Sequence, residues 1–176
     1  MNTPRLFILL LILIGFMSCE KTVINGKDKL DVEKYIALLK SNQYDSLYLP
    51  AFTYKDIPAL LKYRNETQVI SNFPHNPISS MYGPDCKLGM YVLWTIESIR
   101  AKAIKSPNVI MGFPSQNPIL GQRDALGSGF IYFDYDDNTQ TIAARAYNEW
   151  WENNKQKDFD AFKNIDPLAT TVYQWH

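Results

Sequence analysis

The carboxylates are the residues of this chain that could most readily take part in a reaction. Glu97 stands in an otherwise apolar stretch three residues before Arg100, and Asp134, Asp136 and Asp137 form the densest acidic cluster. If Glu97 shared a cleft with one acid from Asp134 to Asp137, the two could act as general acid and base in a hydrolase. The simpler interpretation is a Glu97–Arg100 pair, because residues three apart face each other on a helix.

The acidic cluster also resembles the start of a calcium-binding loop. Asp134, Asp136 and Asn138 match the first three ligand positions of such a loop. The match ends at Thr139, where glycine is needed, and at Arg145, where a bidentate Glu belongs. We therefore expect these acids to open a helix, where negative charge favours the helix dipole, and we expect neither a metal site nor a cofactor.

Nucleophilic catalysis would need a cysteine or serine beside an imidazole base. The chain contains two histidines, His75 and His176, and no Gly-x-Ser-x-Gly motif. We expect His75 to form hydrogen bonds in a loop and retain it as a candidate binding residue. Cys86 is predicted to be a small buried hydrophobic residue, with a reactive thiol as the alternative. The absence of a complete catalytic set favours a binding protein over an enzyme.

Aromatic residues are abundant, with eleven Tyr, nine Phe and four Trp. Tyr147, Trp150 and Trp151 are candidate binding residues, since such side chains could line a groove for a sugar or a peptide. Adjacent residues on a helix point about 100° apart. We therefore expect one of the two tryptophans in the core and the other at an edge. Core packing is the alternative role for most of the aromatic residues.

Apolar periodicity predicts five helical segments that would position these residues. They are 31–44, a short helix with Ile57, Leu60 and Leu61 on its apolar face, a long helix after Asp85, 140–154 and 158–165. The predicted N-terminal caps are Asp31, Thr53 or Asp56, Asp85, and Asn138 or Thr139. The long helix is apolar on most sides, which predicts a central position. Gly89 within it predicts the close approach of a neighbour.

The segments 67–84 and 106–129 are rich in proline and other helix breakers, and we predict two long loops there. Only 130–133 is strongly β-prone. The expected fold is therefore all-α and mainly helical, compatible with HEAT-like paired helix hairpins, with at most a short β element. Lys and Arg together number 18, as do Asp and Glu. This balance gives no electrostatic case for nucleic-acid binding.

The N-terminus predicts export. A polar start with Arg5 precedes the apolar run 6–17, which is too short to span a membrane. Residues 13–19, Leu-Ile-Gly-Phe-Met-Ser-Cys, resemble the lipobox of a bacterial lipoprotein. That resemblance implies a signal peptide at 1–18, lipidation of Cys19 and a tether at 19–29 before a domain at 30–176. It also implies an outer-membrane protein facing the periplasm, since no acidic run follows Cys19.

The chain as a whole resembles small uncharacterised lipoproteins of the Bacteroidota. The resemblance rests on the lipobox and on 76–80, 88–97, 146–151 and 166–168. The resemblance implies a helical fold and a location in the cell envelope, but it implies no reaction. Two functions remain open. The first is a non-enzymatic module, anchored through the lipid on Cys19, that binds an envelope protein or glycan. The second is an envelope-polymer hydrolase that uses Glu97 with an acid from Asp134 to Asp137.

Overall fold

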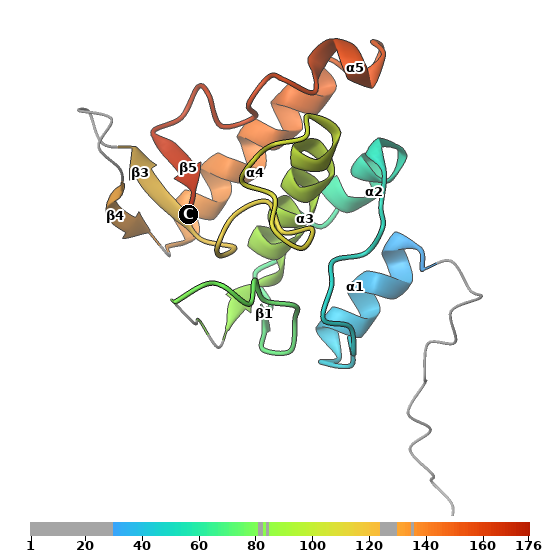
Figure 1. Ribbon diagram of the computed structural model, residues 1–176, viewed down its shortest axis with the longest axis vertical. Helices are drawn as coiled ribbons and strands as arrows, with labels where there is room; N and C mark the ends of the chain where they lie inside the picture. The colour runs from blue at the N-terminus through green and yellow to red at the C-terminus, as the bar shows by residue number, and fades with distance from the viewer. Residues whose placement is uncertain (1–29, 81–82, 84, 124–129, 135) are drawn as a thin grey trace, which may run out of the picture.

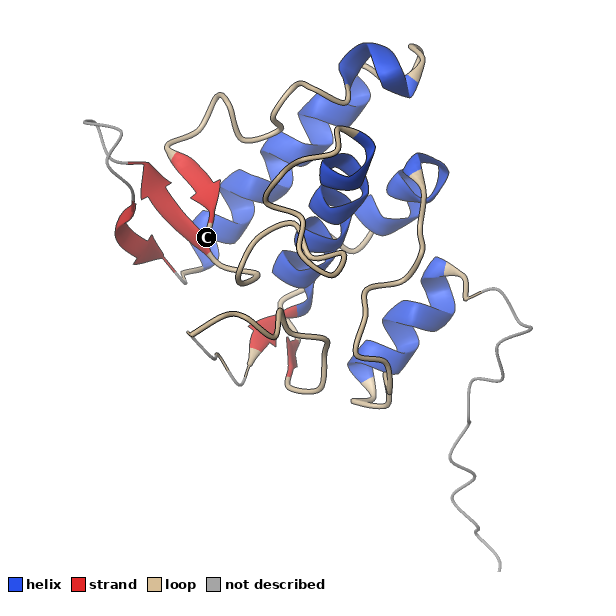
Figure 2. Ribbon diagram, viewed as in Figure 1, coloured by secondary structure: helices blue, strands red, loops and turns tan. Residues whose placement is uncertain are grey.

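The computed structural model describes residues 30–80, 83, 85–123, 130–134 and 136–176. Its helices are α1 (Val32–Lys40), the 3-10 helix η1 (Tyr54–Asp56), α2 (Ile57–Leu61), α3 (Leu88–Ala103), α4 (Asp137–Glu152) and α5 (Phe159–Phe162). Its strands are β1 (Val69–Ile70), β2 (Cys86–Lys87), β3 (Leu120–Arg123), β4 (Phe130–Asp134) and β5 (Tyr173–Trp175). Figure 2 shows mainly helices, with the strands gathered at two places. None of the described helices is long and apolar enough to cross a membrane.

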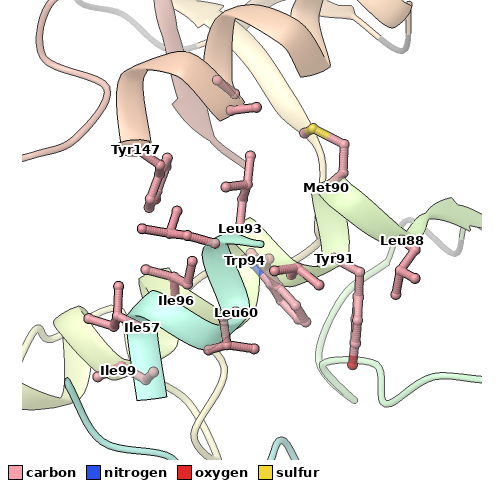
Figure 3. Packing of buried hydrophobic residues seen from close by; sticks show 14 of the residues in the cluster. Ile57, Leu60, Leu88, Met90, Tyr91, Leu93, Trp94, Ile96, Ile99 and Tyr147 are labelled. Atoms are coloured by element: carbon pink, nitrogen blue, oxygen red, sulfur yellow. The ribbon is translucent and has the colours of Figure 1, made fainter. Parts of the chain in front are cut away.

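Helix α3 is the centre of the fold, as its sequence predicts. In Figure 1 it lies between α2 and α4, and both neighbours contact it. Every residue from Leu88 to Ile99 is buried. Figure 3 shows Leu93 and Ile96 of α3 between Tyr147 of α4 and the short helix α2. A helix buried on nearly all sides needs partners all round, and the neighbouring helices and loops supply them.

Helices α3 and α4 run parallel, which differs from the expected helix hairpins. Lys87, just before α3, pairs with Asp137 at the start of α4. Ten residues further along each helix, Glu97 accepts a hydrogen bond from Tyr147. Two contacts in the same order along both helices define a parallel pair, whereas consecutive helices in a hairpin are antiparallel. The long connection between α3 and α4 allows this direction because it carries the chain back to the start of α3.

The fold is mixed and mostly helical, so the all-α prediction is too narrow. Strands β4, β3 and β5 form a three-stranded antiparallel sheet in that order, and β1 pairs with β2. The sheet lies beside the start of α4 in Figure 1, where the Thr139 hydroxyl lies 3.3 Å from that of Tyr173. Strand β4 includes the β-prone run 130–133, so the prediction of a short β element there is confirmed. Strands β3 and β5 have short, polar-interrupted sequences, and only pairing between distant segments stabilises them.

The residues that cap the helices in the structure can be compared with the predicted caps. Asp31 accepts a hydrogen bond from the Lys34 amide at 2.7 Å, and the Thr53–Asp56 capping box is present, as predicted. The cap at Asp85 is wrong, because β2 occupies the next two residues and α3 begins at Leu88. Helix α4 begins earlier than expected and is capped by Asp136, which accepts from the Thr139 amide at 2.7 Å.

Gly89 is required by the close packing of α3 against the 64–66 segment and α4. A Cβ atom there would lie 2.5 Å from the Arg64 carbonyl oxygen and 2.9 Å from that of Glu66. It would also meet the Gln140 amide nitrogen, which donates to both of these carbonyls. The predicted close approach is therefore confirmed, and three segments meet at one position without a side chain.

Candidate functional site

Several of the residues singled out by their chemistry line one of two separate cavities. The larger one, here named the Arg100 cleft, has a volume of about 390 Å³. Its lining includes Glu97, Arg100, Asp166, Trp175 and His176. The smaller one, here named the Gln140 pocket, has a volume of about 200 Å³ and is lined in part by His75, Cys86, Asp136 and Gln140.

A chain of hydrogen bonds forms the inner wall of the Arg100 cleft. The Trp175 indole donates to the Tyr147 hydroxyl at 2.8 Å, and this hydroxyl donates to Glu97 Oε2 at 2.8 Å. Arg100 donates to both Glu97 oxygens, with Nε at 3.0 Å and Nη2 at 2.5 Å. The predicted Glu97–Arg100 pair is confirmed, and its bidentate geometry is the strong form of this contact. The network joins α3, α4 and β5 at one point.

Burial sets the protonation of this network. Burial raises the pKa of Glu97, while the hydrogen bonds from Arg100 and Tyr147 favour its carboxylate form. Burial also raises the pKa of Tyr147 far above its ordinary value, and the neighbouring Glu97 carboxylate adds to that shift. The phenol therefore keeps its proton and remains the donor to Glu97.

Arg100 has donor capacity beyond its structural bonds. A guanidinium carries five N–H groups. Within the described part of the chain, two of them are taken by Glu97 and one by the Lys163 carbonyl oxygen at 3.2 Å. Two N–H groups are left in a residue that lines the cleft. They could donate to a polar ligand without disturbing the Glu97 pair.

Amides, hydroxyls and one aromatic side chain complete the cleft. The lining includes the exposed Asn108 and Gln116, beside the half-buried Gln174 and Trp175. Strand β5 presents Gln174 and Trp175, and it is held by its pairing with β3. A concave site with paired donors and acceptors next to an aromatic side chain suits a polyhydroxylated ligand.

Glu97 does not meet the acidic cluster. Asp137 pairs with Lys87 at the other end of α3, ten residues before Glu97, which is about 15 Å along the helix. Asp136 caps α4 and lines the Gln140 pocket. The Asp134 side chain lies outside the described part. Acid and base groups of glycoside hydrolases lie within about 10 Å of each other. The hydrolase pair of Glu97 with Asp136 or Asp137 is therefore wrong.

The three predicted aromatic binding residues lie mainly in the core. Tyr147 and Trp150 are buried, while Trp151 is half-buried. This matches the expectation that one tryptophan packs inside and the other lies at an edge. Trp175 is the aromatic side chain of the Arg100 cleft instead. The sequence analysis missed Trp175 because it lies in a short strand far from α4 in sequence. Only the preference of Trp for partly buried sites could have singled it out.

The Cys86 thiol has the properties of an unreactive group. It lies near the carbonyl oxygens of Lys87 and Pro118, at 3.4 Å and 4.0 Å. Burial raises its pKa to about 12. Burial also lowers the pKa of His75. Cys86 is half-buried, which is less than predicted, and it packs against the core. A protonated thiol is a poor nucleophile, so the structure favours a packing role over a reactive thiol.

Metal binding has no support from the described residues, among which no three His, Cys, Asp or Glu side chains form a group that could hold an ion. Cys19, the predicted lipidation site, lies outside the part that the structure describes.

Comparison with known protein families shows which family the chain matches. A model of the family described as "Domain of unknown function (DUF4943)" matches residues 26–176. The chain belongs to the DUF4943 family. The match includes every described residue, so both cavities lie within the DUF4943 domain. No curated protein and no solved structure shows significant similarity to the chain.

Proposed function

We propose that this DUF4943 protein is a membrane-anchored lipoprotein of the cell envelope whose domain binds a neutral glycan in the Arg100 cleft. The observation that carries the proposal is the cleft itself, where Arg100, with two N–H groups beyond its structural bonds, lines the same space as Trp175 and several side-chain amides. Glycan hydroxyls both donate and accept hydrogen bonds, and this lining supplies both partners. The Glu97 carboxylate balances the charge of Arg100, which favours a neutral ligand over an acidic one.

The cleft fits a glycan better than a protein partner because it is concave and polar. Protein interfaces have a core depleted in charged groups and enriched in apolar area. The cleft instead gathers Arg100, Asp166 and Glu97 beside the half-buried Trp175.

Binding is tested by applying the protein to an array of neutral oligosaccharides. Gln174→Ala is the informative variant, because Gln174 lines the cleft from β5 and makes no side-chain bond within the described residues. Gln156→Ala is the matched control, since Gln156 is exposed and lies outside the cleft. We expect retention of at least one glycan, weakened by Gln174→Ala and unchanged by Gln156→Ala. Equal retention by the two variants, or no retention by the wild type, would contradict the proposal.

Anchoring is supported by the lipobox-like residues 13–19 and is tested separately. The wild-type protein should fractionate with membranes, and Cys19→Ser should release it. A Cys19→Ser protein that stays with the membrane fraction would refute lipid attachment at this residue without affecting the glycan proposal.

A further inference from the structure

The turn between α1 and η1 exposes two adjacent large apolar side chains. Leu47 is 81% exposed, the highest fraction of any large hydrophobic residue that the structure describes, and Tyr48 is 53% exposed. The flanking Tyr44 and Leu49 are buried, with exposed fractions of 4% and 7%. The chain is therefore packed against the domain on both sides of the turn, and the tip of the turn projects into solvent.

Hydrogen bonds fix the backbone of this turn. The Tyr44 hydroxyl donates to the Tyr48 carbonyl oxygen at 2.9 Å, and the Tyr48 amide donates to Ser46 Oγ at 3.1 Å. The Ser46 hydroxyl also lies 3.2 Å from the Tyr48 carbonyl oxygen, to which it donates. Lipid cannot hydrogen-bond to a backbone group, so a group that leaves water needs a partner within the protein. Both backbone polar groups of Tyr48 have such a partner.

The turn lies close to the place where the domain would be tethered. Tyr35 is about one helical turn from the start of α1 at Val32, and its ring centroid is 5.0 Å from that of Tyr44. Residues 19–29 reach at most about 40 Å when fully extended. A lipid on Cys19 would therefore hold the turn near the bilayer at a high effective concentration, at which a weak contact is sufficient.

A bilayer fits this small patch better than a protein does. A stable protein interface buries about 800 Å² on each partner, far more than two side chains supply. Leucine is favourable in the hydrocarbon region of a membrane, and tyrosine is enriched at the membrane–water interface. One acyl chain alone gives only marginal membrane binding, so a second contact strengthens an anchor. The exposed Asp45 carboxylate beside the turn favours neutral over anionic headgroups.

We propose that the Leu47–Tyr48 turn inserts into the headgroup layer of the bilayer as a second membrane contact beside the lipid on Cys19. This inference rests on the anchoring part of the proposed function. It is independent of the glycan proposal, because the turn lies outside the Arg100 cleft. Strand β5, which lines that cleft, lies on the opposite side of the molecule from α1 (Figure 1). Insertion of the turn would therefore direct β5 away from the bilayer.

The lipidated full chain in phosphatidylcholine vesicles provides the test. Leu47→Cys carries a polarity-sensitive fluorophore, and Val172→Cys is the matched control, because Val172 is 59% exposed and directly precedes β5. Cys86→Ala in both chains leaves the introduced cysteine as the sole thiol to label, since the lipid occupies Cys19. Should Cys86→Ala fail to fold, brief labelling with Cys86 retained is still selective, because burial raises the pKa of this thiol to about 12.

Flotation of the vesicles first shows whether the chain is anchored. We expect the label at position 47 to emit at shorter wavelength and to be quenched by bromine-carrying lipids, several-fold less in a Tyr48→Ser chain. The label at position 172 should emit as it does in the Cys19→Ser protein. A chain that floats with an unquenched label at position 47 would overturn this inference alone, whereas a chain that does not float would refute the anchoring as well. The shorter-wavelength emission without vesicles would show that a second copy of the chain covers the turn, which would also overturn the inference.

Discussion

Gly89→Ala is the most informative single change in the core of this protein. In an ordinary helix the substitution would stabilise, because Ala is favoured over Gly by about 1 kcal/mol. Here the new methyl group would lie 2.5 Å from the Arg64 carbonyl oxygen and 2.9 Å from that of Glu66. These are backbone atoms, so the 64–66 segment would have to move away from α3.

The magnitude follows from what such a movement would break. Overpacking in a core costs about 1–3 kcal/mol. Displacing the 64–66 carbonyls also weakens the two bonds from Gln140 Nε2 and the bond from the Gly89 amide to Glu66 at 2.9 Å. Loss of buried hydrogen bonds costs about 1–3 kcal/mol more. After the gain in helix propensity, we expect the free energy of unfolding to fall by roughly 1–5 kcal/mol.

Urea denaturation followed by tryptophan fluorescence measures this change. Gly83→Ala is the matched control, since within the described part of the chain the nearest atom to a Cβ there is 3.8 Å away. The control should stay within about 0.5 kcal/mol of the wild type. A Gly89→Ala protein as stable as the wild type would refute the close packing of α3 against α4 and the 64–66 segment.

Three further predictions concern other parts of the fold. Tyr147→Phe removes the hydroxyl shared by Trp175 and Glu97 and should lower the free energy of unfolding by about 1–3 kcal/mol; a change under 0.5 kcal/mol would exclude the network. Asp31→Ala removes the cap of α1 and should cost about 1 kcal/mol in the same assay, with no loss if the cap is absent. With Cys19 replaced by Ser, Cys86 should react with a thiol reagent about 1,000-fold more slowly in the native than in the urea-unfolded protein, because its pKa rises from 9.0 to about 12 and only the thiolate reacts. Equal rates would show an exposed, reactive thiol.

Local sequence signals predicted the parts of the fold that depend on neighbours in the chain. Asp31 and the Thr53–Asp56 capping box need only the next three residues, and both were correct. The apolar run of α3 predicted its central position, and Gly89 predicted a close neighbour. At Asp85 the cap failed because Cys86 and Lys87 pair with β1 instead of entering the helix.

Long-range pairing explains what the sequence did not reveal. Strand β3 has little β propensity of its own and β5 is only three residues long, so both form because they meet in one sheet. The parallel packing of α3 and α4 depends on the path of the loop between them. Trp175 reaches the Arg100 cleft through that sheet, so its role could not be read from local spacing. The pairing of Glu97 with Arg100 was predicted correctly because the two residues are only three positions apart in the sequence.

The indole N–H resonance of Trp175 tests the central claim most directly. Neutral oligosaccharides are titrated into the labelled protein, and Trp175→Phe assigns the signal. Trp151, which is half-buried and lies outside the cleft, is the internal reference. If a glycan binds in the Arg100 cleft, the Trp175 resonance shifts and saturates while that of Trp151 does not. A glycan that shifts only Trp151, or a full set of oligosaccharides that leaves Trp175 unchanged, would contradict the proposed function.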